Sequence, residues 1–94
     1  MLNEFQVETE AKLKDVLSFK QIAGNFKIDA GQEESATIAT IGPYVCWIYP
    51  DGADVSGDGI DKRFEIYDYD SLKQLQMAFI QFVDQLLSRK SDAV

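Results

Sequence analysis

The sequence predicts an α+β fold in which two helices cover one face of a four-stranded antiparallel sheet, in the order α-β-β-β-β-α. Three observations lead to this prediction: a helical apolar pattern near each end, alternating apolar segments between them, and glycine-containing connections that separate these segments. The 94 residues suffice for one domain, and no repeat, low-complexity tract or long linker divides them. We therefore expect residues 1–94 to form a single domain.

The first helix is expected from Leu2 to about Lys20. Its apolar residues form one stripe when successive residues are placed about 100° apart, and its charged residues lie elsewhere. The stripe consists of Leu2, Phe5, Leu13, Val16 and Leu17, with Thr9 in line. Gly24 is a plausible end for this helix, because glycine readily takes the backbone conformation that stops one.

The segments after Gly24 alternate between apolar and polar residues as strands do. Three strands are expected at 26–30, 36–41 and 44–49, and Gly42-Pro43 suits a type II′ hairpin turn between the last two. Residues 50–61 are expected to form a loop that leads to a fourth strand at 63–67. Asp70 is expected to cap the second helix. The apolar side of that helix consists of Leu72, Leu75, Phe79, Ile80, Phe82, Val83, Leu86 and Leu87.

Alternation also divides the strand residues between two faces of the sheet. The side expected to face the helices carries Phe26, Ile28, Ile38, Cys46, Ile48, Phe64 and Ile66. The opposite side carries Ile41, Val45, Trp47, Tyr49, Tyr67 and Tyr69, with Thr37, Ala39, Arg63 and Glu65 among them. If this side is open it is an aromatic patch, and such surfaces usually mark interaction sites. The alternatives are that another part of the chain covers it or that two copies pair through it.

The charge of the chain is strongly negative, at −7 with a pI near 4.3. Residues 51–70 hold seven of the 16 acidic residues against only Lys62 and Arg63. This balance argues against direct nucleic-acid binding, which depends on Lys and Arg, and it favours a basic protein partner. Acidic rows can also imitate DNA phosphates, so a nucleic-acid-mimic inhibitor is a further alternative.

The chemistry of a conventional enzyme is largely missing from these residues. The chain has no histidine, and therefore lacks the commonest general base and most zinc ligand sets. It has no Gly-rich phosphate loop, and the single Cys46 lies in an apolar run where we expect an inert buried thiol. We expect no catalytic residues and no cofactor, although a pair of carboxylates could in principle support hydrolysis.

Residues 54–65 show the most specific local pattern, that of a twelve-residue calcium loop. Oxygen-bearing side chains stand at positions 1, 3 and 5, glycine at position 6 and glutamate at position 12. The ligands would be Asp54, Ser56, Asp58 and Glu65. The flanks differ from an EF-hand, because strands are expected where its helices should be, and Asp61 occupies position 8, which is normally apolar. A calcium loop of another type is therefore the rival to a simple acidic connection.

These observations favour a non-catalytic module that binds a basic protein, or itself as a homodimer. The residues expected to bind the partner are Trp47, Tyr49, Tyr67, Tyr69 and Arg63, with Asp54, Asp58 and Asp61 at the charged rim. Small acidic proteins of this kind include inhibitors, immunity factors and accessory proteins of phages and mobile elements, which is an analogy of class. The first residues lack a secretory pattern and no apolar run is long enough to span a membrane, so we expect a cytoplasmic protein that binds no membrane.

Overall fold

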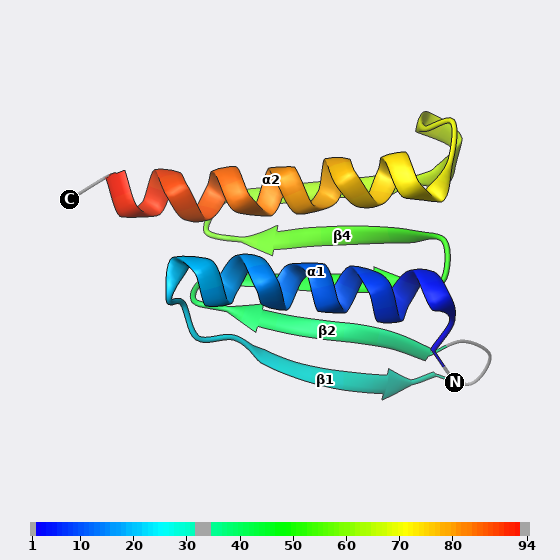
Figure 1. Ribbon diagram of the computed structural model, residues 1–94, viewed down its shortest axis with the longest axis horizontal. Coiled ribbons are helices and arrows are strands. Elements are labelled where there is room, and N and C mark those ends of the chain that lie inside the picture. The colour runs from blue at the N-terminus through cyan, green and yellow to red at the C-terminus, as the bar shows by residue number, and fades with distance from the viewer. Residues whose placement is uncertain (1, 32–34, 93–94) are drawn as a thin grey trace.

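The computed structural model describes residues 2–31 and 35–92. Along the described chain, one helix precedes a five-stranded sheet and a second helix follows it. The elements are α1 (Glu4–Lys20), β1 (Asn25–Ala30), β2 (Ser35–Ile41), β3 (Tyr44–Tyr49), β4 (Gly52–Gly57), β5 (Ile60–Glu65), the 3₁₀ turn η1 (Ile66–Asp68) and α2 (Leu72–Asp92). Figure 1 shows both helices across the same face of the sheet and running in the same direction. The α+β class is confirmed, but the prediction of four strands is wrong.

The additional strand is β4, which lies inside the stretch expected to be a loop. Glycine and aspartate are depleted in strands, so Gly52-Ala53-Asp54 gave no strand signal. Two-residue turns close the three hairpins from β2 to β5. Gly42 has a φ of +58°, as the expected type II′ turn requires, and Asp58 and Gly59 have φ values of +52° and +80°, as a type I′ turn requires. Residues 52–65, which contain most of the acidic stretch noted in the sequence, thus form a β-hairpin.

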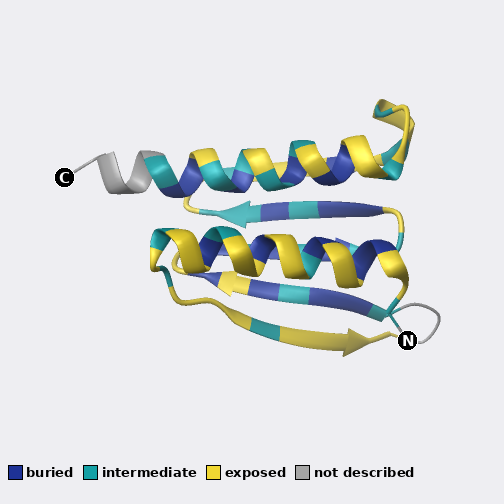
Figure 2. Ribbon diagram, in the orientation of Figure 1, coloured by how far each residue is buried: buried dark blue, intermediate teal, exposed yellow. Residues whose placement is uncertain are grey.

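The sheet is an antiparallel meander in the order β1-β2-β3-β4-β5. α1 packs on β2 and β3, α2 packs on β4 and β5, and the two helices contact each other. The largest fully buried side chains include Leu13 and Phe79 from the helices and Ile41, Ile48 and Val55 from the sheet. β1 lies beyond α1, and nearly all of its residues are exposed (Figure 2).

The orientation of β2 differs from the prediction. Ile41 pairs with Tyr44 across the Gly42-Pro43 turn, so Thr37, Ala39 and Ile41 face the helices and Ile38 faces the opposite side. The sequence left this strand ambiguous because Ala36, Ile38 and Ile41 do not share one alternation. A strand whose two faces are both partly apolar takes its register from its turn.

The residues that end α1 and cap α2 lie close to the residues that the sequence predicted for these roles. Asn3 and Gln6 form a reciprocal capping box at the start of α1, and Gln21, in a left-handed conformation with φ +58°, ends that helix before Gly24. At α2 the cap is Ser71, whose Oγ accepts a hydrogen bond of 3.2 Å from the Gln74 backbone N–H, and not Asp70. Each correction moves a boundary by a few residues and leaves the helix in place.

Gln6 also ties α1 to the sheet. Its side chain is fully buried, and its Nε2 donates to the carbonyl oxygens of Ser35 at 2.6 Å and Ile48 at 3.1 Å. A buried amide needs such partners because an unmade hydrogen bond in the core costs about 1–3 kcal/mol. The N-terminal turn of α1 is thereby fixed over β2 and β3.

Substitution of Gly57 tests how the turns hold the sheet. Gly57 has φ +118°, and a Cβ there would collide with the carbonyl oxygen of Pro43 in the neighbouring turn. We expect Gly57→Ala to lower the free energy of unfolding by at least about 2 kcal/mol, as measured by urea denaturation. Gly59→Ala is the matched control, because its φ of +80° is also strained but its Cβ would meet no atom within 4 Å. Equal losses in the two variants would contradict this role of the Pro43 contact.

Candidate functional site

The face of the sheet turned away from the helices carries the aromatic residues of β3. In β3 the buried residues Tyr44, Cys46 and Ile48 alternate with the half-buried Val45, Trp47 and Tyr49. The rings of Trp47 and Tyr49 are stacked, with centroids 6.2 Å apart and an interplanar angle of 12°. Both helices lie on the other side of the sheet (Figure 1), so neither helix covers these rings. We call this surface, centred on Trp47 and Tyr49, the open face.

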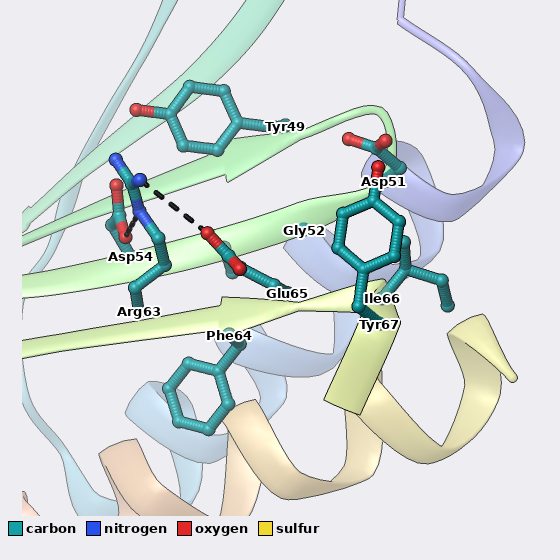
Figure 3. A pocket seen from close by; sticks show the side chains of 10 residues that line it. Tyr49, Asp51, Gly52, Asp54, Arg63, Phe64, Glu65, Ile66 and Tyr67 are labelled. Atoms are coloured by element: carbon teal, nitrogen blue, oxygen red, sulfur yellow. Dashed lines mark hydrogen bonds and ion pairs between the residues drawn. The ribbon is translucent and has the colours of Figure 1, made fainter. Parts of the chain in front are cut away.

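A short row of charged side chains borders the open face on β4 and β5. Asp54 lies opposite Trp47 on one side and opposite Arg63 on the other. Arg63 Nε is 3.2 Å from Asp54 Oδ1, and Arg63 Nη1 is 3.6 Å from Glu65 Oε1, so the guanidinium bridges the two carboxylates (Figure 3). Because the Arg63 side chain is 67% exposed, these ion pairs add little to folding stability. They fix the position of charges at the surface.

A shallow pocket of about 230 Å³ adjoins the open face where β3, β4 and β5 meet η1. Its lining includes Tyr49, Asp51, Gly52, Asp54, Arg63, Glu65, Ile66 and Tyr67 (Figure 3). There is no room for a side chain at position 52, because a Cβ there would lie 2.7 Å from the Phe64 carbonyl oxygen. Three carboxylates and one guanidinium line the pocket, and its surroundings are therefore net acidic.

The environment of Tyr49 reflects this acidity. Burial raises the pKa of the Tyr49 hydroxyl, and the negative charge of Asp54 and a hydrogen bond to it raise the pKa further, while Arg63 lowers it. The phenol therefore stays protonated at neutral pH and can donate a hydrogen bond. This makes Tyr49 a polar contact as well as an apolar one.

The structure brings together most, but not all, of the residues expected to bind a partner. The strand register places five of them on the open face: Trp47, Tyr49, Asp54, Asp61 and Arg63. Asp58 lies in the β4–β5 turn, and Tyr67 lies at the pocket with 92% of its surface exposed. Tyr69 is on the opposite side, where its ring stacks on Phe64 at 6.4 Å.

The misplaced aromatic residues share one cause. β5 ends at Glu65, and the next residues form η1, so strand alternation stops before Ile66. The prediction that the strand extends through 66–67 was wrong, and so was the expectation that Tyr69 joins the patch. Tyr67 comes near Tyr49 through the turn of the chain and not through the alternation of a strand.

The expected calcium ligands are spread along a hairpin. Asp54 and Ser56 lie on β4, Asp58 in the turn and Glu65 at the end of β5, so the segment does not wrap around a point. Arg63 bridges Asp54 and Glu65 and so places a positive charge between two of the four oxygens. Among the described residues, no group of three or more acidic or cysteine side chains could hold a metal ion. The structure thus gives the calcium hypothesis no enclosing loop.

Sequence reasoning missed a second apolar surface, in a groove between the outer sides of α1 and α2. The groove has a volume of about 780 Å³ and is lined by Val16, Phe19, Met77 and Ile80 with several polar residues. Phe19 is 89% exposed and Met77 is 62% exposed. The sequence did contain one indication of this groove, because Phe19 is a large apolar residue that does not lie on the apolar stripe of α1. This groove is on the opposite side of the molecule from Trp47.

Two further findings bear on chemistry and location. Cys46 is fully buried between the sheet and the helices, and burial raises the pKa of its thiol from 9.0 to about 12. At neutral pH it is therefore neutral and a poor nucleophile. Over the described part of the chain, neither helix is long and apolar enough to cross a membrane.

Comparisons of the chain with protein-family models, with curated proteins and with solved structures gave no match. The functional proposal therefore depends on the geometry and charge of this chain alone.

The Cys46 thiol predicts how stability changes at alkaline pH. Above pH 9.0 the unfolded thiol ionises, whereas the folded thiol stays neutral up to about pH 12, so the free energy of unfolding falls across this range. The loss due to Cys46 is expected to reach about 4 kcal/mol by the upper limit. Denaturation curves at several pH values for the wild type and Cys46→Ala measure it, and the variant should show the shallower decline. Parallel declines would show that Cys46 is accessible to water in the folded state.

Proposed function

We propose that this protein is a non-catalytic binding module whose open face docks on another protein with a basic surface. The observation that carries the proposal is that both helices pack on one face of the sheet (Figure 1), and the alternation of β3 leaves the stacked Trp47 and Tyr49 rings on the other. Trp and Tyr are among the residues most enriched at the energetic centres of protein interfaces. A partner that covered them would exclude water from a ready-made apolar surface.

The pocket beside Tyr49 supports a basic partner. Its volume of about 230 Å³ is below the roughly 300–1,000 Å³ of small-molecule sites, which suits a single side chain. Asp51, Asp54 and Glu65 outnumber Arg63 in its lining, and Tyr49 and Tyr67 offer aromatic rings for a cation. We therefore propose that a lysine or arginine of the partner enters this pocket.

The chain-wide charge of −7 is consistent with a partner of opposite charge, which long-range attraction would bring in faster. The proposal includes the role of a small inhibitor, immunity factor or phage accessory protein, each of which can act by occupying a basic surface. The acids are not arranged as a continuous phosphate-like row, because Arg63 interrupts them and Asp58 and Asp51 lie at opposite ends of β4. Docking on a protein is therefore preferred to imitation of DNA.

Replacement of Trp47 tests the docking face. Wild type, Trp47→Ala and Phe19→Ala proteins would be immobilised and used to capture partners from a lysate of the source cell. We expect one protein to be retained by the wild type and by Phe19→Ala but lost with Trp47→Ala. With that protein purified, Trp47→Ala should weaken binding by at least about 30-fold, since central interface residues contribute about 2 kcal/mol or more.

Two controls make this test decisive. Circular dichroism should show that Trp47→Ala remains folded, because Trp47 is only half-buried. Trp47 is the only tryptophan of the chain, so its fluorescence in the wild type should become less accessible to acrylamide when the partner binds. Loss of the partner with Phe19→Ala and retention with Trp47→Ala would instead place the docking site in the helix groove.

The acidic rim predicts a separate kinetic effect. Asp58→Asn and Asp61→Asn remove charge with little change of shape, and asparagine tolerates the positive φ of residue 58. We expect the double variant to slow association with the captured partner severalfold at low salt, with little change in dissociation. Stopped-flow measurements at several salt concentrations would show it, and Glu8→Gln on exposed α1 is the control. An association rate independent of both salt and these residues would exclude steering by the rim.

A further inference from the structure

β1 is an edge strand whose outer side is unoccupied by any described segment. It pairs with β2 alone, and no helix lies over it (Figures 1 and 2). Five of its six residues are exposed, and Ile28 exposes 62% of its surface although it lies on the side that faces the helices. An exposed edge with an exposed apolar residue is a template for pairing with another strand.

The register shows which backbone groups of β1 are available. Ile41 and Tyr44 flank a two-residue turn and so form a hydrogen-bonded pair, as residues flanking such turns do. Alternation along β2 then directs the backbone groups of Ala36, Ile38 and Thr40 towards β1. Their partners Asn25, Lys27 and Asp29 are thereby satisfied. The N–H and C=O groups of Phe26, Ile28 and Ala30 point outwards from the sheet.

The side chains of β1 are complementary to those of a second, antiparallel β1. Lys27 and Asp29 are exposed on the side of the open face, and neither forms an ion pair with a described residue. If Ile28 lies opposite Ile28 of a second copy, Lys27 lies opposite Asp29 of that copy, and Asp29 opposite its Lys27. The outward backbone groups of Phe26, Ile28 and Ala30 then meet the same groups of the other strand.

We propose that two copies of this chain associate through β1 in this register, which makes one continuous sheet across both copies. The exposed Ile28 side chains meet at the two-fold axis, and two Lys27–Asp29 pairs flank them on the other side of the sheet. A two-fold axis normal to the sheet places both open faces on the same side. The dimer would thus present two Trp47 surfaces to a partner.

Charge excludes the neighbouring registers. A shift that centres the pairing on Lys27 or on Asp29 places two like charges opposite each other, which is destabilising. At the other edge, β5, pairing centred on Arg63 or on Lys62 would set two like charges opposite each other. Pairing centred on Phe64 would set Arg63 against Glu65, but Arg63 already forms ion pairs with Asp54 and Glu65 of its own chain. We therefore favour β1, whose Lys27 and Asp29 form no ion pair with a described residue.

Charge reversal tests the register directly. Lys27→Asp alone gives two acidic pairs across the interface, and Asp29→Lys alone gives two basic pairs. We expect each single variant to weaken self-association about tenfold, because both cross-strand pairs change from attractive to repulsive. An equimolar mixture of the two variants should associate as well as the wild type, because every Asp then faces a Lys. The double variant K27D/D29K should also be restored.

Sedimentation equilibrium supplies the measurement, with a wild-type mass approaching twice the 10.6 kDa of the chain as the expected result. Lys73→Asp, an equal charge change at an exposed site on α2, should leave the mass unchanged. Ile28→Pro removes an outward N–H without breaking a bond to β2, and it should give a folded monomer. A wild type that stays at the monomer mass up to millimolar concentration, or a mixture no more associated than either variant, would overturn the proposal.

The proposed dimer and the proposed docking face can be tested separately. Trp47→Ala should leave the dimer mass unchanged, because Trp47 does not lie on β1. If Trp47→Ala abolishes the dimer while Lys27→Asp does not, the two copies pair through the open face and the β1 register is wrong.

Discussion

The register of the sheet depends on three two-residue turns, and the arrangement of the rest follows from it. A two-residue turn allows only one pairing of the residues that flank it, so Ile41 pairs with Tyr44. This pairing determines which side chains of β2 and β3 face the helices. A slip of one residue would move Cys46 and Ile48 out of the core and Trp47 into it. In the β2–β3 and β4–β5 turns, the backbone at Gly42, Asp58 and Gly59 adopts the positive φ values that such turns require.

With the faces assigned, the two helices can bury only one of them. α1 and α2 together span β2 to β5, and their apolar stripes account for the core. On the sheet itself, two surfaces that carry apolar residues stay uncovered by the helices: the aromatic residues on the opposite face and the edge strand β1. The chain is small enough that each uncovered apolar residue is a substantial loss of burial, which a partner or a second copy can recover.

The charges around the two proposed interfaces favour different kinds of partner. The open face adjoins Asp54, Asp61 and Glu65, with a single bridging Arg63, so it favours a basic surface. β1 instead carries one Lys and one Asp, spaced so that a strand running the other way reverses their order. This difference is why we propose a different protein as the partner of the open face and a second copy of the chain as the partner of β1.

The sequence by itself determined the two helices, most of the strands, the Gly42-Pro43 turn and the presence of Trp47 and Tyr49 together on one face of a strand. These follow from local periodicity and turn chemistry, which short segments express without help. Only the tertiary structure showed that residues 52–57 form a strand, because Gly and Asp there are held by pairing with β3 and β5 and not by their own propensity. It also decided the orientation of β2, the loss of Tyr69 from the patch, the bridge of Arg63 between Asp54 and Glu65 and the exposure of Phe19 and Ile28. Each of these depends on which distant residues the chain brings alongside, and that information is absent from any one segment.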